Sequence, residues 1–193
     1  MAQRGRDIFQ KGKPLLLAAA RFYRLFPMRV RVKLFEHYRG MKGAKGMAVR
    51  YALLKSIARS CGDNVSIHPG VYLLCPQRLS VGNNVSIHPM CYLDATGDLT
   101  IGNDVSIAHG CSLLSTSHQY AVLDVSIKDQ PCKIEETVIR DNVWLGAKAT
   151  VVCGITVESG AIVGANAVVT HPIPANAIAV GVPARVIKIR CSV

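Results

Sequence analysis

An aliphatic side chain returns at every sixth position through the second half of this 193-residue sequence. The repeated positions are Ile139, Leu145, Val151, Val157, Val163 and Val169. A surface helix repeats its apolar residues about every 3.6 positions and a half-buried strand every second position, so neither element explains a period of six. A chain that winds through three short, flat faces per turn does explain it, because each face then takes six residues.

The same period occurs earlier, with its phase shifted by short insertions such as residues 95–100. The earlier positions are Val81, Ile87 and Leu93, followed by Ile101, Ile107 and Leu113. The unit V-S-I-H-P occurs twice, at residues 65–69 and 85–89. In such a coil each turn stacks its aliphatic side chains on those of the turn before, which forms a continuous core. The sequence therefore predicts an all-β solenoid, a parallel β-helix of hexapeptide repeats, over residues 61–190.

The first turn of a solenoid exposes strand edges and core side chains, which a capping element has to cover. Residues 47–59 are a candidate cap, because apolar residues recur there at helical spacing. The apolar stripe consists of Val49, Leu53 and Ile57. We expect the charged side chains of this helix to point away from the solenoid; they are Arg50, Lys55 and Arg59.

One segment, residues 119–137, lacks the period and interrupts the solenoid between Leu113 and Ile139. A long loop inside a regular array is usually functional. The segment follows His118 directly. The sequence therefore predicts an excursion loop that begins at a histidine.

The positive charge of the chain is concentrated at its start. Residues 1–60 contain 15 Lys or Arg against Asp7 and Glu36, a balance of +13, whereas the whole chain carries +11. The balance from residue 61 onward is therefore −2. We divide the chain into a basic amphipathic helical head or cap, residues 1–60, and a β-helix domain, residues 61–190, that contains the loop 119–137.

Bulky apolar residues lie among the cations of the head, including Leu15, Phe22 and Leu25. Such segments tend to lie in the membrane interface and to favour anionic lipid. One hypothesis is therefore a peripheral membrane contact through residues 1–59, at the inner face of the membrane. The alternative is a soluble helical cap with a solvated charged face. We expect no nucleic-acid partner, because no recognised motif accompanies the charge.

The seven cysteines are scattered singly, without a C-x-x-C pair, which indicates reduced thiols in a cytoplasmic protein. The longest apolar run near the start, residues 15–20, is short for a membrane span and for the core of a signal peptide. We therefore expect a cytoplasmic location.

The sequence resembles the hexapeptide-repeat O-acetyltransferases, the group that contains the maltose, galactoside, nodulation-factor and colanic-acid-type polysaccharide acetyltransferases. Three motifs carry the resemblance most specifically: N-V-W-L-G at residues 142–146, V-G-A-N-A-V-V-T at 163–170 and G-V-P-A-R-V-I-K at 181–188. The resemblance covers residues 61–190. It implies a left-handed β-helix and an acetyl-CoA-dependent O-acetyltransferase that acts on a sugar hydroxyl of a surface polysaccharide or its precursor.

The resemblance places the catalytic base at His118, in the stretch Ser-Thr-Ser-His of residues 115–118. A base with a near-neutral pKa suits this reaction, because a sugar hydroxyl is a poor nucleophile until its proton is removed. The resemblance also implies direct transfer without an acyl-enzyme, and a backbone N–H that stabilises the oxyanion. From its position alone, His118 could instead be a loop histidine that only holds the local structure.

The resemblance also assigns substrate contacts. Asp94 is the candidate for acceptor binding, unless it is a corner aspartate that bonds its own backbone. Small side chains would lie along the pantetheine arm, and cations would meet the phosphates at the nucleotide end. His171 stands where the family commonly has Lys. The predicted donor-binding residues are Trp144, Ala147, Ala165, Thr170, His171, Arg185 and Lys188.

Members of the family are homotrimers whose active sites lie between adjacent prisms, so we expect a homotrimer, a carbohydrate acceptor and no metal requirement. A γ-type carbonic anhydrase shares the prism and holds zinc with three histidines. However, the position five residues before His109 is Asp104, so the expected histidine pair is missing. Two further hypotheses are a non-catalytic binding subunit and an acetyltransferase for a small acceptor such as an antibiotic or serine.

Overall fold

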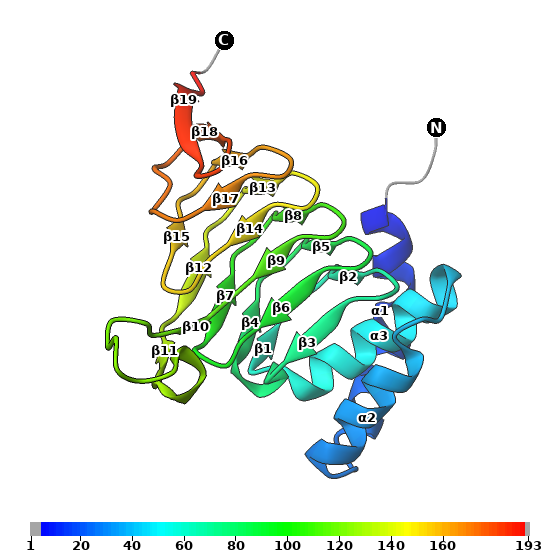
Figure 1. The fold of residues 1–193 in the computed structure, drawn as a ribbon. Coiled ribbons are helices and arrows are strands. Elements are labelled where there is room, and N and C mark those ends of the chain that lie inside the picture. Colours follow the sequence, from blue (N-terminus) through cyan, green and yellow to red (C-terminus); the bar gives the residue numbers. More distant parts are fainter. Residues whose placement is uncertain (1–4, 192–193) are drawn as a thin grey trace.

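The structure, a computed structural model, describes residues 5–191. Its main part is a left-handed parallel β-helix, and three helices pack at the N-terminal end of this solenoid (Figure 1). The predicted all-β solenoid with a helical N-terminal segment and an excursion loop is therefore confirmed.

The solenoid has three faces, each a sheet of stacked short strands. The first sheet contains β1 (Ser60–Cys61), β4 (Leu79–Val81), β7 (Leu99–Ile101), β12 (Thr137–Ile139) and β15 (Thr156–Val157). The second contains β2 (Ser66–Ile67), β5 (Ser86–Ile87), β8 (Ser106–Ile107), β13 (Trp144–Leu145), β16 (Ile162–Val163), β18 (Ala177–Val180) and the antiparallel β19 (Arg185–Ile189). The third contains β3 (Tyr72–Leu74), β6 (Tyr92–Asp94), β9 (Ser112–Leu113), β14 (Thr150–Val151) and β17 (Val168–Val169).

The length of a turn changes along the prism. Ser60 pairs with Ser80, and Ser80 pairs with Thr100, so an early turn runs from Ser60 to Ser80. Thr100 pairs with Val138 across the turn that contains the excursion loop, and Val138 pairs with Thr156. The late turn from Val138 to Thr156 is therefore two residues shorter than an early one. The two additional residues of an early turn lie between the third and the first sheet, where the sequence predicts a shift of phase.

The residues of the six-residue period form the core. Ile139, Leu145 and Val151 are fully buried, and so are Val157, Val163 and Val169 in the next turn. The smaller residues between them are buried too; they are Val143, Ala149, Ile155, Ala161 and Ala167. All seven cysteines are free thiols. Stacked aliphatic side chains thus fill the prism along its length, as the period indicates.

Asparagine and aspartate shape the corner between the first and second sheets. Asn64, Asn84 and Asn142 have φ values of 54, 57 and 56°, a left-handed conformation that these side chains tolerate better than most. The neighbouring side chains connect the turns, because the N–H of Asp63 donates to Asn83 Oδ1 at 2.9 Å. The N–H of Asn83 donates in the same way to Asn103 Oδ1 at 2.9 Å. The corner is therefore held by a ladder of side chains that runs along the prism.

The head consists of α1 (Gly5–Tyr23), α2 (Met28–Tyr38) and α3 (Gly43–Ile57), and β1 begins three residues after α3. Helix α3 lies across the first turn and contacts β1 and β2, while α1 and α2 both pack on α3 (Figure 1). Leu53, Leu54 and Ile57 of α3 are almost completely buried. The predicted helical cap is thus confirmed over residues 47–57; the helix begins four residues earlier than predicted, at Gly43, and ends two residues earlier, at Ile57. Within residues 5–191, no helix is both long enough and apolar enough to cross a bilayer.

The expectation that the charged residues of the segment 47–59 point away from the solenoid is wrong for two of the three. Arg50 is 0% exposed, and its Nε donates to the carbonyl of Ile67 at 2.9 Å in the first turn. Its Nη1 donates to the carbonyls of Tyr38 at 3.1 Å and Met41 at 2.6 Å, where α2 ends. Arg50 therefore joins α3, the end of α2 and the solenoid, because a guanidinium can satisfy several carbonyls that a helix end leaves without partners.

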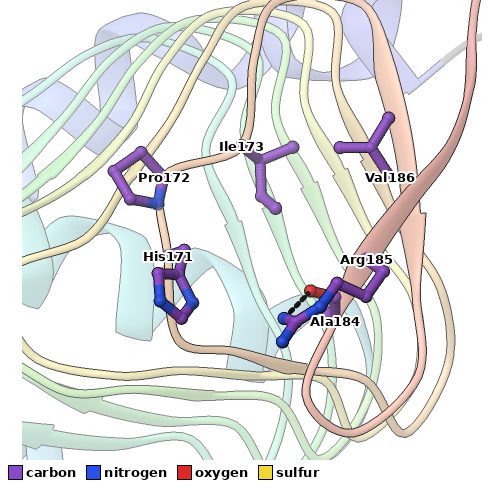
Figure 2. A pocket seen from close by; sticks show the side chains of 6 residues that line it. All are labelled: His171, Pro172, Ile173, Ala184, Arg185 and Val186. Carbon is purple, nitrogen blue, oxygen red and sulfur yellow. Dashed lines mark hydrogen bonds between the residues drawn. The ribbon is translucent and has the colours of Figure 1, made fainter.

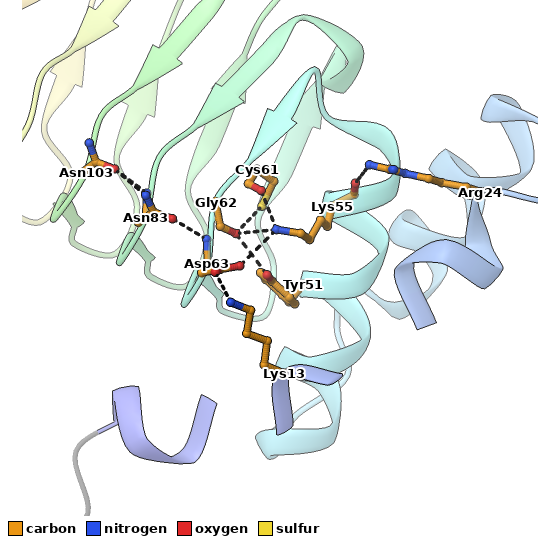
Figure 3. Close-up of polar contacts among 9 residues, drawn as sticks. All are labelled: Lys13, Arg24, Tyr51, Lys55, Cys61, Gly62, Asp63, Asn83 and Asn103. Carbon is orange, nitrogen blue, oxygen red and sulfur yellow. Dashed lines mark hydrogen bonds and ion pairs between the residues drawn. The ribbon is translucent and has the colours of Figure 1, made fainter. Parts of the chain in front are cut away.

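Lys55 is the second residue that differs from the expectation. Its Nζ donates to the carbonyls of Cys61 at 2.8 Å and Gly62 at 3.1 Å, and it lies 3.4 Å from Asp63 Oδ1 (Figure 3). Lys13 of α1 reaches the other oxygen of Asp63 at 2.7 Å. Only Arg59 behaves as predicted: its side chain is 50% exposed and pairs with Asp98. Two cations from different helices thus fix the head on the first turn.

This cluster predicts a pH dependence of stability. The hydrogen bond from Lys13, together with the charge of Lys55, lowers the pKa of Asp63 below its ordinary value. Because the pKa is lower in the folded than in the unfolded chain, the stabilisation is present above about pH 4 and is lost as the pH falls through the folded value. We expect Asp63→Asn to lose less unfolding free energy than the wild type between about pH 7 and pH 3. Urea unfolding at several pH values measures this, with Asp124→Asn in the exposed loop as the control; equal pH dependence of Asp63→Asn and wild type would contradict it.

Candidate active site

Three segments leave the prism at one corner, between the third and the first sheet. Residues 75–78 and 95–98 are short, and residues 114–136 form the excursion loop in the next turn. The loop begins with a two-stranded antiparallel ribbon of β10 (Thr116–His118) and β11 (Cys132–Ile134), visible as the protrusion in Figure 1. His118 is the last residue of β10, is exposed, and pairs in register with Cys132. We call this the base corner.

The base corner is anchored by buried hydrogen bonds. Ser115 is 0% exposed; its Oγ donates to the carbonyl of Asp94 at 2.7 Å and accepts the N–H of Gly97 at 2.7 Å. Where the loop returns, Thr137 Oγ1 donates to the carbonyl of Leu114 at 2.7 Å. Both ends of the loop are therefore attached to the prism by hydrogen bonds, so the ribbon that carries His118 is anchored at both ends.

Asp94 lies in the same corner, one turn before the loop. Its Oδ2 accepts the hydroxyl of Thr116 at 2.6 Å and its Oδ1 accepts the N–H of Thr96 at 2.9 Å. The side chain is 3% exposed. The second bond is the corner geometry that the sequence left as an alternative, in which an aspartate bonds its own backbone two residues on. The first bond holds the strand that carries His118, because Thr116 and His118 lie on the same face of β10.

Burial on its own would raise the pKa of the Asp94 carboxyl, but hydrogen bonds from Thr116 and Thr96 outweigh burial and leave the pKa below its ordinary value. The carboxylate is therefore ionised at neutral pH and accepts both bonds as a charged group, which makes them stronger than neutral ones. The geometry gives Asp94 a role in positioning β10. Contact between Asp94 and the acceptor stays a prediction.

The tip of the loop has internal structure. Gln130 is buried, and its Nε2 donates to the carbonyls of Val122 at 2.8 Å and Val125 at 2.9 Å. A short 3-10 helix, η2 (Ile127–Asp129), precedes it. Large apolar side chains nevertheless remain exposed along the tip, including Tyr120 and Leu123 at 74% and 95%. A glutamine thus orders a loop whose apolar side chains face outward.

The predicted pantetheine contacts lie at a second corner, between the second and the third sheet. The N–H of Lys148 donates to the carbonyl of His109 at 2.9 Å, and that of Asn166 donates to the carbonyl of Ala147 at 2.8 Å. These bonds align His109, Ala147 and Ala165 in one column, one residue per turn. The structure therefore brings the two predicted alanines together; Ala165 is exposed and Ala147 is half-buried. We call this the donor column.

The glycines beside the two alanines have a packing role. A Cβ at Gly146 would lie 2.6 Å from the backbone nitrogen of Ala165, and a Cβ at Gly164 would lie 2.7 Å from Val180 Cγ1. Stacking of consecutive turns therefore requires glycine here. Trp144, two residues before Gly146 on β13, is 52% exposed on the outer face of the second sheet.

The predicted nucleotide contacts gather at the C-terminal end of the prism. A pocket of about 280 Å³ is lined by His171, Pro172, Ile173, Ala184, Arg185 and Val186 (Figure 2). Thr170 Oγ1 lies 2.9 Å from Nδ1 of His171. Arg185 and His171 are exposed on opposite sides of this pocket, and exposed Lys188 follows on β19. Four of the predicted donor residues thus occupy one end of the molecule, and the cations among them suit the phosphates of a nucleotide.

The base corner and the donor column lie on different edges of the prism. Within the third turn, His109 precedes β9 and His118 follows it, so one strand of the third sheet lies between the two edges. Figure 1 shows the ribbon of β10 and β11 on one side of the solenoid and the connections from β8 to β9 on the other. The described chain therefore does not by itself bring the predicted base together with the predicted donor residues.

The aligned turns place three further histidines at the corner that contains the donor column, none of which the sequence predicted as a site residue. His109 occupies the donor column directly before Ala147 and is exposed. In the neighbouring column, the rings of His68 and His88 stack with centroids 4.8 Å apart and 9° between planes. The pKa of His68 is lowered by burial, with His88 and Arg50 adding to the effect. A count that makes the early turns two residues longer than the later ones would have placed these histidines at the corner that contains the donor column.

Metal-ligating side chains do not gather in the part of the chain that the structure describes. Within residues 5–191, no group of three or more His, Cys, Asp or Glu side chains could hold a metal ion.

Comparisons with known proteins agree with the fold that carries this site. Residues 136–171 match the family described as bacterial transferase hexapeptide (six repeats). A maltose O-acetyltransferase from Clostridium difficile 630 has a similar structure, with a TM-score of 0.74 and 25% identity over 84% of this chain and 86% of that one. A hexapeptide-repeat acetyltransferase from Vibrio cholerae aligns with a TM-score of 0.73 and 21% identity over 83% of this chain and 89% of its own, which shows the fold alone.

Among curated proteins, a 2,3,4,5-tetrahydropyridine-2,6-dicarboxylate N-acetyltransferase of Staphylococcus aureus is 44% identical over 59 residues, which cover 31% of this chain and 25% of that protein. The chain thus spans about a quarter of the length of the curated relatives it matches. The family match covers residues 136–171, and similarity of structure extends over most of the chain.

Proposed function

We propose that this protein transfers an acetyl group from acetyl-CoA to a sugar hydroxyl. The chain carries the hexapeptide repeat of bacterial transferases, and its fold is that of the hexapeptide-repeat acetyltransferases. The observation that carries the proposal is the combination of an exposed histidine on an anchored ribbon, two stacked alanines on another edge of the prism and a pocket lined by Arg185 and His171 at the C-terminal end. We take the acceptor to be a surface polysaccharide or its precursor.

His118 acts as the general base in this proposal. Its imidazole takes the proton of the acceptor hydroxyl while the oxygen attacks the thioester carbonyl, and the C–S bond then breaks. The imidazolium returns the proton to the sulfur, which leaves as the thiol of CoA. Backbone N–H groups along the donor column are suited to stabilise the oxyanion. Cysteine takes no part in this proposal; Cys91 and Cys111 are 0% exposed, and the exposed Cys132 beside His118 is the thiol to test.

The pocket at the C-terminal end would hold the nucleotide of acetyl-CoA. Arg185 and Lys188 would pair with its phosphates, and the arm would run along Ala165 and Ala147 toward the third turn. His171 stands where the resembled family commonly carries Lys, and this replacement would weaken the contact with the phosphates. Trp144 would stand beside the arm.

The separation of the base corner from the donor column supports an active site between copies of the chain. We propose a homotrimer in which His118 of one copy faces the donor column of the next. Enzyme and acetyl-CoA would meet in the cytoplasm. An acceptor carried on a lipid would bring the enzyme to the inner face of the membrane, with residues 1–59 as the contacting part.

The proposal is tested by following thiol release from acetyl-CoA with nucleotide sugars, oligosaccharides and lipid-linked glycans as acceptors. We expect release that depends on one of these classes and continues in the presence of a metal chelator. Acceptance of only serine or an antibiotic would favour a small-molecule acetyltransferase. Carbon dioxide hydration that the chelator abolishes, without acetyl transfer, would favour the zinc enzyme.

Replacing Arg185 with alanine tests the donor pocket. We expect KM for acetyl-CoA to rise about tenfold with little change in kcat, because one charge-assisted contact to a phosphate is lost in ground state and transition state alike. Arg140→Ala is the matched control. Arg140 is an exposed arginine at the corner between the first and second sheets, away from the predicted donor residues. An unchanged KM in Arg185→Ala would remove this residue from the donor site.

Asp94→Asn separates two roles of the buried carboxylate. If Asp94 positions β10 through Thr116, we expect kcat to fall about tenfold while KM for the acceptor changes little. If it contacts the acceptor, KM for the acceptor rises instead. Thr116→Val, which removes the same hydrogen bond from the other side, should reproduce the effect of the positioning role. Steady-state kinetics with the acceptor varied distinguishes the two.

A further inference from the structure

The turn between α1 and α2 exposes an unusual set of side chains. Residues 21–30, which we call the tip, read R-F-Y-R-L-F-P-M-R-V and contain three arginines and no acidic residue. The exposed apolar side chains are Phe22 at 57%, Leu25 at 79%, Phe26 at 38%, Met28 at 36% and Val30 at 40%. Arg21, Arg24 and Arg29 are exposed among them. Bulky apolar groups and cations thus share one short surface.

The tip is ordered rather than frayed. The rings of Phe22 and Phe26 pack edge to face with centroids 5.4 Å apart. The N–H of Leu25 donates to the carbonyl of Phe22 at 3.1 Å, and Arg24 Nη2 donates to the carbonyl of Lys55 at 3.1 Å. Arg31, just behind the tip, donates to the carbonyl of Ser56 in α3. The apolar groups are therefore held outward by the packing of the head.

The tip lies at the helical end of the molecule, away from β18 and β19 (Figure 1). It is a turn between two helices, and a hollow of about 470 Å³ lies beside it, lined by Met28, Arg29, Val32, Lys33, Glu36 and Gln77. Phe22, Leu25 and Phe26 lie outside this hollow, so they offer a projecting surface rather than a groove for a peptide. Large apolar side chains that are exposed side by side mark a candidate interaction site. Phenylalanine and leucine side chains flanked by arginine match the interface of a bilayer, where apolar groups enter the acyl boundary and cations stay with the headgroups.

We propose that the tip is the membrane-binding element of this protein, and that it inserts Phe22, Leu25 and Phe26 into a bilayer rich in anionic lipid. The charge balance of +13 in residues 1–60 favours a negative surface, whereas residues 61–193 carry a balance of −2. The choice of the inner leaflet rests on the proposed function, but the binding itself requires no acetyl transfer. A threefold axis would bring three tips to the same height, and their combined binding would be much stronger than that of one.

Flotation of the full chain with vesicles tests the proposal. We expect the wild type to float with vesicles that contain about 30% phosphatidylglycerol and to remain below with phosphatidylcholine alone. Leu25→Asp should lower the partition coefficient at least about tenfold, because it places a charge where an apolar side chain enters the acyl boundary. The pair Arg21→Glu and Arg29→Glu should lower it by a similar factor, and salt should weaken binding of the wild type.

Matched controls lie on the excursion loop. Leu123→Asp removes a leucine that is 95% exposed, and Lys128→Glu reverses an exposed charge; both should float like the wild type. His118→Ala should also float, so that failure of catalysis and failure of membrane binding are distinguished. Far-ultraviolet circular dichroism and thermal unfolding confirm that Leu25→Asp is folded. Equal flotation of Leu25→Asp and wild type, flotation that ignores lipid charge, or no flotation of the wild type would each overturn the proposal.

Discussion

Replacing His118 with alanine is expected to lower kcat for acceptor-dependent thiol release by at least about 100-fold, with KM for acetyl-CoA nearly unchanged. The physical reason is that the acceptor hydroxyl keeps its proton when no base is present to accept it, so the oxygen attacks the thioester poorly. The exposed position of His118 at the end of β10 suggests that the change leaves the fold intact, which a thermal unfolding curve checks. Initial rates measured with a thiol reagent give kcat for both proteins.

Cys132→Ser is the matched control for this experiment. Cys132 pairs with His118 across the ribbon, so the variant alters the neighbouring position without removing the base. Direct transfer predicts that its kcat stays within about twofold of the wild type, whereas an acyl-cysteine intermediate predicts loss of activity. Equal rates for His118→Ala and wild type would show that another group is the base. His109, which stands exposed in the donor column, would then be the next histidine to replace.

Replacing Arg50 with alanine is expected to lower the free energy of unfolding by about 3–5 kcal/mol, the largest effect on stability that we predict. The guanidinium donates to the carbonyls of Ile67, Tyr38 and Met41, and its loss leaves these acceptors unpaired beside a cavity. Its Nη2 has no partner among residues 5–191, so the stabilisation comes from Nε and Nη1. Urea unfolding followed by circular dichroism measures the change.

Two further variants make the result specific. Arg59→Ala removes an arginine whose side chain is 50% exposed in its ion pair with Asp98, and should cost no more than about 1 kcal/mol. Arg50→Met keeps much of the side-chain volume but none of the donors. A loss in Arg50→Met close to that in Arg50→Ala would attribute the effect to hydrogen bonds, and a much smaller loss would attribute it to the cavity. If Arg50→Ala unfolds like the wild type, the proposed junction of α2, α3 and the solenoid is wrong.

The cap illustrates where sequence reasoning reached its limit. The spacing of Val49, Leu53 and Ile57 predicts a helix with an apolar stripe, and the structure confirms that helix. The same rule assigns Arg50 to solvent, because a helical wheel counts an arginine as polar surface. The carbonyls that attract the guanidinium belong to α2 and to the first turn, and no local pattern indicates that they come together there.

The active site shows a similar division. The motifs predict Ala147 and Ala165 as neighbours, and the stacking of turns brings them together. The sequence also leaves open whether Asp94 bonds its own backbone, and the bond from Thr96 shows that it does. The link from Asp94 to Thr116 joins two turns, so its existence depends on how the extra residues at the base corner displace the chain. Which residues of successive turns stack on one another at each edge depends on the difference in length between early and late turns.

The sequence by itself determined the solenoid, because a six-residue period of aliphatic side chains buries a continuous core only in a three-faced coil. It also determined the cap, the excursion loop after His118 and the small-residue motifs, since each depends on neighbours along the chain. Only the tertiary structure decided the burial of Arg50 and the separation of the base corner from the donor column. These features depend on contacts between turns and helices that are far apart in sequence, where burial and hydrogen bonding outweigh local preference.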